Sequence, residues 1–317
     1  MPSRTSQTTR IAVAFACVYL CWGMTYGAIR IAGLYMAPPL VGALRSLLST
    51  VILLAICVIR GTSLRVSRST AWRLVLVGIL MMTVNNLLLI WGETKIPSGL
   101  ASLIIAMIPI LVALIETALP GGETLNAFGW LGTLLGVVGM AVLLSPVLQR
   151  TGAAANRDSV AGFGILIAAA FAFAAGSVFS RRSHFSVDTF VATAWQIGAA
   201  GLLNLILATA GGCFRTAHWT RPGLLAIAFL STFGSVVGLT AYTYLLKHVA
   251  VTKVATYAFV NPVIAVLIGV AAFHERLAHA ELAGMVLILA AVATVIASRT
   301  RAPAIPADAT QEVPIEE

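Results

Sequence analysis

The stretch FVNPVIAVLIGVAAFHERL, residues 259–277, repeats a pattern that the first half of the chain also carries. Glu275 follows Pro262 by 13 residues, and Glu123 follows Pro109 by 14 residues. A leucine comes two residues after each glutamate, and a glycine comes nine residues after it. A chance recurrence would have to match all of these positions in register, so we interpret the pattern as an internal duplication.

The composition predicts an integral membrane protein. The 317 residues are 59% hydrophobic and only 10% charged, whereas a soluble domain carries about 25% charged residues. We interpret the net charge of +9 as basic residues on cytoplasmic loops rather than as a nucleic-acid site. The four cysteines show no CxxC or Cys/His spacing, so neither a disulfide framework nor a metal site is expected.

A transmembrane helix needs about 20 mostly apolar residues, and ten segments of the chain meet this requirement. They are residues 11–32, 38–59, 72–92, 98–119, 126–148, 160–180, 188–211, 222–245, 252–273 and 279–298. We therefore expect an all-α membrane protein with ten transmembrane helices, arranged as two inverted five-helix repeats. The repeats cover residues 11–148 and 160–298, with a cytoplasmic N-terminal segment at residues 1–10 and a disordered acidic tail at residues 302–317.

The distribution of basic residues predicts the orientation in the membrane. Because each repeat has an odd number of helices, the second repeat is turned over and both termini lie on one side. Of the 20 lysines and arginines, twelve lie on that side, seven on the opposite side, and Arg45 within a helix. The excess predicts that both termini are cytoplasmic, in what we expect to be a bacterial inner (plasma) membrane.

Several motifs together resemble the drug/metabolite transporter superfamily, specifically its EamA-type ten-helix members. They are CWGMTYGAIR at residues 21–30, VGALRSLLS at residues 41–49, and the two proline–glutamate stretches at residues 108–125 and 261–277. The resemblance covers about 290 residues. It implies transport of small metabolites, often export, from a central cavity between the two halves, and it does not specify a substrate.

The leading hypothesis is a secondary transporter that exports amino acids or related amphipathic solutes by alternating access. Inverted repeats are typical of transporters, and the chain contains no P-loop or ATPase motif, so we expect no ATP and no cofactor. The expected partners are a small-molecule substrate and the lipid bilayer, without nucleic acid, and the choice between monomer and dimer stays open. Uptake of a small metabolite is an alternative.

An intramembrane enzyme acting on a lipid-like substrate is an alternative of another class. It would use the cluster of His274, Glu275, His279 and Glu281. That cluster is confined to one loop and lacks a matching nucleophile, so we expect no catalytic residues and no enzyme.

Polar and aromatic residues deep in the spans are candidates for a substrate cavity. The adjacent amides Asn85 and Asn86 would be unsatisfied in lipid, so at least one should face the protein interior. Trp22 and Tyr26 are four residues apart and share a helix face. The cavity candidates are Trp22, Thr25, Tyr26, Asn85, Asn86, Ser177, Tyr242, Tyr257 and Asn261. Amide and aromatic groups suit amino acids and related solutes, whereas a phosphate site would need several buried basic residues.

Two charged residues lie within or near the ends of spans. Arg45 lies about seven residues, or roughly 10 Å, below the outer edge of the second span. A charge at that depth is a functional hypothesis by default, and a structural pairing is the alternative. Glu116 lies near the inner end of the fourth span, where it either pairs locally or carries a proton.

Pro109 and Pro262 are expected about ten residues inside their helices rather than at a helix start. A proline there removes a backbone hydrogen bond and bends the helix, either as a packing kink or as an opening around the substrate. Glu123 and Glu275 are expected to cap the helices that follow them. The glycine stripe of the fifth span, Gly129, Gly132, Gly136 and Gly139, predicts close helix packing within the monomer rather than dimerisation.

Overall fold

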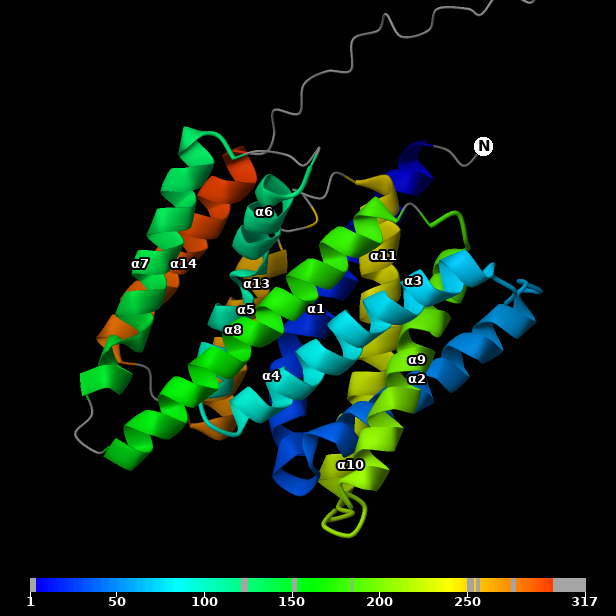
Figure 1. The fold of residues 1–317 in the computed structure, drawn as a ribbon, viewed down its shortest axis with the longest axis horizontal. Helices are drawn as coiled ribbons and strands as arrows, with labels where there is room; N and C mark the ends of the chain where they lie inside the picture. The colour runs from blue at the N-terminus through cyan, green and yellow to red at the C-terminus, as the bar shows by residue number, and fades with distance from the viewer. Residues whose placement is uncertain are drawn as a thin grey trace, which may run out of the picture.

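The structure is a computed structural model that describes residues 4–120, 125–149, 153–183, 185–249, 254, 257–274 and 278–298. Every regular element within these ranges is helical (Figure 1). Among the described residues, seven helices are long and apolar enough to cross a membrane, and three further apolar helices are shorter. Together they correspond to the ten spans that the sequence predicts.

The first five spans contain eight helical elements. They are α1 (Arg4–Tyr35), α2 (Pro38–Ile59), α3 (Arg68–Gly78), the π-helical η1 (Ile79–Val84), α4 (Asn85–Glu93), α5 (Ser98–Ile105), α6 (Ile108–Ala118) and α7 (Ala127–Gln149). The third span is continuous through α3, η1 and α4, whereas the fourth is divided into α5 and α6.

The last five spans repeat this order. They are α8 (Ala153–Arg182), α9 (Thr189–Ala210), α10 (Arg221–Phe229), the π-helical η2 (Leu230–Val237), α11 (Gly238–His248), α13 (Tyr257–Phe273) and α14 (His279–Ser298). The eighth span, through α10, η2 and α11, therefore has a π-helical segment at the place where the third span has one.

Helices α3, α9 and α10 start after residues whose side chains accept hydrogen bonds from free backbone N–H groups. The side chain of Ser67 accepts a hydrogen bond from the Thr70 amide at 3.1 Å, and Asp188 accepts one from the Phe190 amide at 2.8 Å. After α2, Gly61 takes a φ of +63°, which an L side chain adopts only with strain. These boundaries lie within a few residues of the predicted ones.

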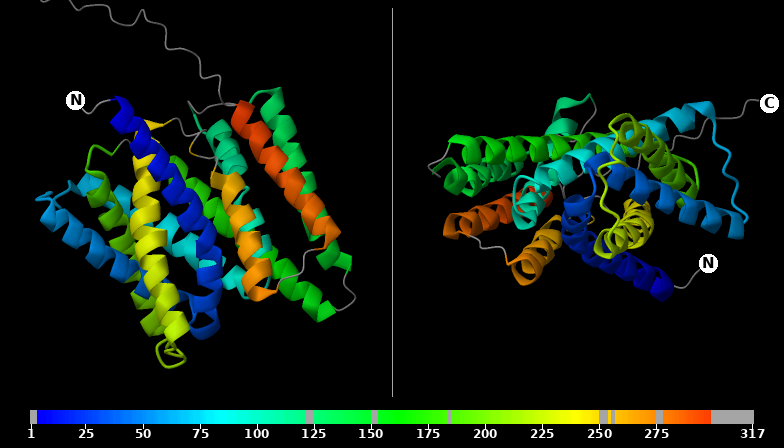
Figure 2. Two further views of the ribbon diagram at one scale, coloured as in Figure 1. Left: turned by 180° about the vertical axis from the view of Figure 1, so that it is seen from behind. Right: turned by 90° about the horizontal axis from the view of Figure 1, so that it is seen from below.

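The first span packs against helices of both repeats. Seen from behind, α1 lies between α11 and α13, while α2 lies against α9 (Figure 2). The N-terminal end of α1 and the C-terminal end of α14 lie on the same side of the molecule (Figure 1). This arrangement is the one that ten membrane crossings require.

The glycine stripe of α7 packs against α14 of the same chain. A Cβ atom added to Gly132 would lie 2.9 Å from a Val295 methyl group, and one added to Gly139 would lie 3.0 Å from the Ile288 side chain. Small residues allow this close approach of two helices. The interpretation of the stripe as packing within the monomer is confirmed.

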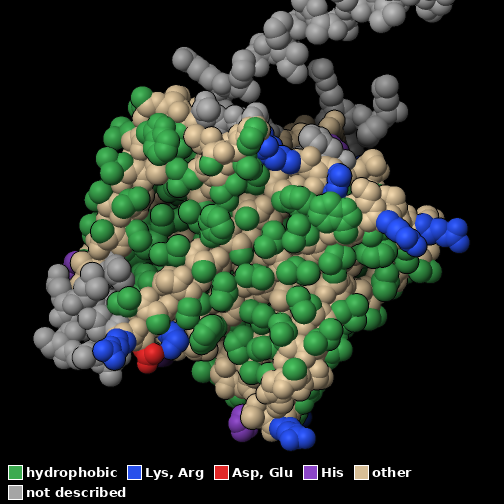
Figure 3. Space-filling model, viewed as in Figure 1, with side chains coloured by type: hydrophobic (Ala, Val, Ile, Leu, Met, Phe, Trp, Pro, Cys, Tyr) green, Lys and Arg blue, Asp and Glu red, His purple; other side chains and the backbone are tan. Residues whose placement is uncertain are grey.

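The outer surface matches a lipid environment. Hydrophobic side chains cover the middle of the face shown in Figure 3, whereas lysines and arginines gather toward its two ends. Large side chains such as Leu202 of α9 and Val137 of α7 are more than half exposed. In water this surface would be unfavourable, and in a bilayer it is solvated by acyl chains.

The expected position of Pro109, about ten residues inside one continuous helix, was wrong because the fourth span is divided into two helices. Helix α5 ends at Ile105, the chain turns at residues 106–107, and Pro109 lies in the first turn of α6. A proline is tolerated there because the first N–H groups of a helix have no intrahelical partner. Pro262 does lie inside its helix, α13. Glu123, Glu275 and the tail at residues 302–317 lie outside the described residues.

Candidate functional site

A cavity of about 70 Å³ lies between the two repeats. One water needs roughly 10–15 Å³ of such space, so in this conformation the cavity has room for about five water molecules. Seven of the predicted candidates line it. They are Trp22, Thr25, Tyr26, Asn85, Asn86, Tyr257 and Asn261.

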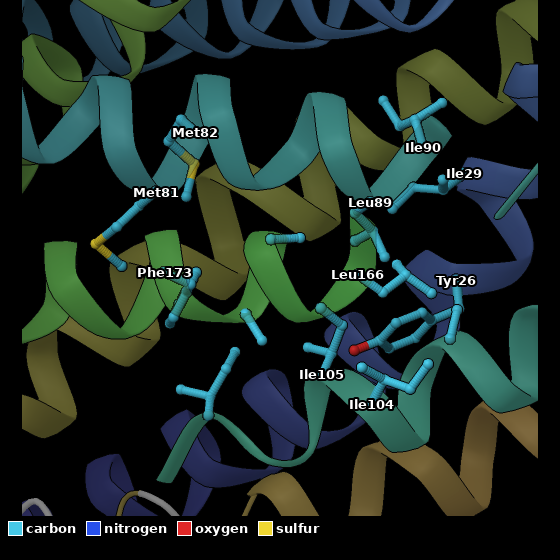
Figure 4. Close-up of a cluster of buried hydrophobic side chains, with 14 of the residues drawn as sticks. Tyr26, Ile29, Met81, Met82, Leu89, Ile90, Ile104, Ile105, Leu166 and Phe173 are labelled. Atoms are coloured by element: carbon cyan, nitrogen blue, oxygen red, sulfur yellow. The ribbon is translucent and has the colours of Figure 1, made fainter. Parts of the chain in front are cut away.

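The rest of the lining consists of Arg45, one glycine and seven apolar residues. The residues that sequence reasoning missed are Ile29, Met82, Leu89, Ile105, Ile108, Phe173, Gly234 and Leu239. Figure 4 shows how the side chains of Tyr26, Leu89 and Ile105 converge from α1, α4 and α5. Helical spacing could have identified two of these residues, since Ile29 follows Tyr26, and Leu89 follows Asn86, by three positions.

Ser177 and Tyr242 do not line this cavity, although both lie near it. The Tyr242 ring packs 5.0 Å from the Trp22 ring and 5.8 Å from the Tyr257 ring, measured between centroids. Ser177 donates a hydrogen bond to the Phe173 carbonyl at 2.8 Å. Tyr242 therefore packs against two rings that line the cavity, whereas Ser177 bonds to the backbone of its own helix.

Three rings that line the cavity come from both repeats, and we call them the aromatic wall: Trp22, Phe173 and Tyr257. Trp22 of α1 meets Tyr257 of α13 edge to face, with centroids 5.3 Å apart and planes at 88°. Phe173 of α8 also meets Trp22 edge to face, at 6.4 Å. Edge-to-face pairs are favourable arrangements of ring quadrupoles, so they hold the Trp22 ring in one orientation.

The two π-helical segments border the cavity and offer backbone carbonyls to side chains. A π turn departs from the i→i−4 hydrogen-bond pattern, and the membrane interior has no water to satisfy a freed carbonyl. In η1, the Asn86 amide donates to the carbonyls of Met81 at 3.3 Å and Met82 at 3.1 Å. In η2, the Trp22 indole N–H donates to the Gly234 carbonyl at 3.0 Å.

Arg45 connects the two π-helical segments. Its Nε donates to the Ser235 hydroxyl in η2 at 2.8 Å, and its Nη1 donates to Asn86 Oδ1 at 2.9 Å. The residue is only 8% exposed. Both partners are neutral, and no carboxylate within the described ranges forms an ion pair with this guanidinium.

Two glycines in the eighth span allow these side chains to approach. A Cβ atom on Gly234 would lie 2.9 Å from the Thr25 methyl group and 3.3 Å from Arg45 Nη2. A Cβ atom on Gly238 would overlap the Trp22 indole. Ser231, Gly234, Ser235 and Gly238 recur at helical spacing within an apolar span, and that spacing is a signal by which sequence reasoning could have identified this face.

Glu116 pairs with the second repeat rather than with a neighbour on its own helix. Its Oε2 accepts a hydrogen bond from Arg182 Nη2 of α8 at 2.9 Å, and its Oε1 lies 4.0 Å from Arg181 Nη1. At the opposite end of α8, Asp158 pairs with Lys95 at 2.8 Å. Helix α8 is therefore tied to the first repeat at both ends, away from the cavity lining.

Glu93 is a buried acid that the sequence prediction missed, because the third span was expected to end one residue earlier. It is 6% exposed at the end of α4. In the loop considered for an enzyme, His274 and His279 are exposed, and Glu275 lies outside the described residues. The described part of the chain holds no group of three His, Cys, Asp or Glu side chains suited to a metal ion.

Comparisons with known proteins agree in the kind of protein they match. The sequence model of the EamA-like transporter family matches twice, at residues 9–145 and 160–297. The chain is 33% identical to the "Uncharacterized inner membrane transporter YedA" of Escherichia coli (strain K12) over 295 residues, or 92% of each chain. It is 27% identical to the "Uncharacterized transporter YvbV" of Bacillus subtilis (strain 168), covering 90% of this chain and 92% of that one.

A solved crystal structure is also similar, with a TM-score of 0.66 and 23% sequence identity. The match covers 90% of this chain and 97% of the other. At this identity the likeness shows the fold alone.

Proposed function

The chain belongs to the EamA-like transporter family, and on that premise we propose that it is a secondary transporter exporting amino acids or related amphipathic solutes by alternating access. The observation that carries the substrate class is the composition of the cavity between the repeats. Its lining places three asparagines, four aromatic rings and one guanidinium beside apolar side chains. Such a surface offers hydrogen bonds to a polar end of a solute and apolar contacts to the rest of it.

The charge of the cavity supports a solute with little net charge. Arg45 is the basic residue that lines it, within the described part of the chain. A phosphorylated solute carries about two negative charges and would leave at least one of them without a partner in a poorly hydrated site. Amino acids and their relatives match this single guanidinium better.

The irregular helices support alternating access. The π-helical segments occupy equivalent places in the third and eighth spans, and the fourth span is broken at residues 106–107. Helices bend most readily at such irregularities, so the two repeats have matching places at which to change shape around the cavity. Inverted repeats with interrupted helices beside the binding site are a common basis for exchanging inward-open and outward-open states.

The proposed orientation places both termini in the cytoplasm of a bacterial inner (plasma) membrane. It follows from the excess of lysines and arginines on that side. Export is the proposed direction, and uptake is the competing direction. Glu116 and Glu93 are buried acids outside the cavity lining, and we assign Glu116 a structural pairing with α8 rather than proton coupling.

The test is solute flux through the purified protein in liposomes without ATP. Radiolabelled amino acids, nucleobases, polyamines and cationic drugs are loaded one at a time, and efflux is compared with that of protein-free liposomes. We expect efflux of at least one amphipathic solute. The proposal would be contradicted if no solute in the panel moved and none of them stabilised the protein thermally. Efflux assays in intact cells and in everted vesicles then decide the direction.

A further inference from the structure

We infer that the cavity recognises a zwitterionic α-amino acid through two separate groups: Arg45 binds its carboxylate, and Asn261 accepts a hydrogen bond from its ammonium group. The inference rests on the proposed function and specifies its substrate chemistry. It comes from two side chains in one cavity. Among the described residues, Arg45 has no carboxylate partner and Asn261 Oδ1 has no hydrogen-bond partner.

Arg45 supplies a buried positive charge with no negative counterpart among the described residues. Its Nε and Nη1 are occupied by the neutral oxygens of Ser235 and Asn86. These two bonds fix the plane of the guanidinium while it still lines the cavity. A buried charge is unfavourable without a charged partner, and a guanidinium binds a carboxylate with short, charge-assisted hydrogen bonds. The solute's carboxylate would provide the missing negative charge.

Asn261 supplies an acceptor. It lies in α13 directly before Pro262 and is only 4% exposed, and it lines the same cavity as Arg45. Among the described residues, its Oδ1 has no hydrogen-bond partner. Buried amide oxygens are almost always hydrogen-bonded, so an unpartnered one in a cavity wall indicates a donor that arrives with the ligand.

The aromatic wall favours an ammonium group in the same cavity. Trp22 and Tyr257 both line the space and hold each other edge to face. Ring faces attract cations, most strongly when water is excluded. An amine is therefore the donor that best suits both the Asn261 oxygen and the surrounding rings.

The two groups belong to different repeats, Arg45 to α2 and Asn261 to α13. A zwitterion bound by both would join the repeats through its own two charges. A solute lacking either charge would contact only one side. Recognition of both ends therefore couples the occupancy of the cavity to the relative arrangement of the two halves, which is the movement that alternating access needs.

The experiment compares ligands that differ by one charged group, using the full-length protein in detergent. L-alanine, L-alaninamide and propionate are titrated in a thermal-shift assay, because the 70 Å³ cavity favours a small side chain. We expect L-alanine to stabilise the protein at a concentration about tenfold lower than L-alaninamide or propionate, since each analogue lacks one charge-assisted interaction. Equal stabilisation by the three compounds would overturn the inference.

Variants of the protein test which side chain binds the carboxylate and which binds the ammonium group. Arg45→Gln should abolish the advantage of L-alanine over L-alaninamide, while Arg45→Lys retains part of it. Asn261→Leu should abolish the advantage over propionate. Two matched controls lie outside the cavity and should keep both preferences: Arg60→Gln at the end of α2, and Asn204→Leu, which replaces an amide that is 0% exposed between α9 and α2.

The outcomes separate this inference from the proposed function. If liposomes transport a solute without a carboxylate and amino acids neither bind nor move, the inference fails and the transporter stands. If no solute moves, the proposed function is contradicted, and the inference that rests on it is contradicted as well. The wild-type ligand comparison needs no variant, so misfolding of Arg45→Gln would not protect the inference from a negative result.

Discussion

The third and eighth spans occupy equivalent places in the two repeats, and each contains a π-helical segment, yet the two segments are held in different ways. In η1, the carbonyls of Met81 and Met82 accept side-chain hydrogen bonds from Asn86 of the same span. In η2, the carbonyls of Gly234 and Ser231 accept hydrogen bonds from Trp22 of α1 and Ser49 of α2. The carbonyls of the first segment accept from their own span, whereas those of the second accept from neighbouring helices. Thr83 of η1 also donates to the Ala200 carbonyl of α9, at 3.4 Å.

The difference shows that the two repeats share a backbone irregularity without sharing the residues that support it. Arg45 joins the two systems, because it binds Asn86 beside η1 and Ser235 within η2. The comparison predicts that a substitution of Asn86 destabilises both π-helical segments, whereas a substitution of Trp22 or Ser49 destabilises η2 alone.

The largest effect is expected for Asn86→Ala. The substitution removes a partner from the buried Arg45 charge and removes the side-chain donor of two backbone carbonyls of η1. We expect a loss of about 3 kcal/mol in the free energy of unfolding, measured by chemical denaturation in detergent, together with a strong loss of flux. Asn126→Ala, at an exposed cap, is the matched amide control. Equal stability of the two variants would refute the linking role of Asn86.

A smaller effect is expected for Gly238→Ala, which tests the dependence of η2 on α1. The added methyl group would overlap the Trp22 indole, and overpacking of this kind costs about 1–3 kcal/mol. Gly164→Ala in α8 is the control, because nothing lies within 4 Å of a Cβ atom there. Thermal unfolding of both variants measures the difference. If Gly238→Ala melted with the control, Trp22 would not be fixed against the eighth span.

Trp22→Phe isolates the indole hydrogen bond from the aromatic packing. The ring contacts with Tyr242 and Tyr257 are largely kept, whereas the bond to the Gly234 carbonyl is lost. We expect a destabilisation of about 1 kcal/mol and a moderate reduction in flux. Trp22→Ala removes the ring as well and should impair flux more than Glu123→Gln at equal expression. The reverse order would remove the support for Trp22 as a cavity residue.

The smallest effect is expected for Ser49→Ala. The Ser49 hydroxyl lies 3.1 Å from the Ser231 carbonyl and 2.6 Å from the Arg45 carbonyl of its own helix. Without the hydroxyl, both carbonyls still lie within helices. We therefore expect a loss of about 0.5 kcal/mol in the free energy of unfolding and flux close to that of the wild type. A thermal shift as large as that of Gly238→Ala would show that η2 depends on α2 as strongly as on α1.

Most of the fold was predictable because hydropathy is a local property. The ten spans, the duplication and the packing role of the glycine stripe follow from segment length, residue spacing and side-chain size. Seven of the nine cavity candidates also meet at one cavity. They were found because polar and aromatic groups deep in apolar spans must turn away from lipid.

The remaining features depend on contacts between segments far apart in the chain. Pro109 was placed inside a continuous helix, because hydropathy does not register the turn at residues 106–107. Glu116 was considered for local pairing, but its partners lie 65 and 66 residues away on α8. The π-helical segments left no sequence signal that distinguishes them from an ordinary α-helix.

The sequence by itself determined that this chain crosses the membrane as two inverted repeats and which polar residues lie deep within it. The tertiary structure alone decided that Arg45 lies between Asn86 and Ser235, 41 and 190 residues away from it. It also placed Ser177 and Tyr242 outside the cavity lining. The physical reason is that a span is specified by its own transfer free energy to lipid. The chemistry of a cavity is specified by which hydrogen-bonding groups the packed helices leave facing one another.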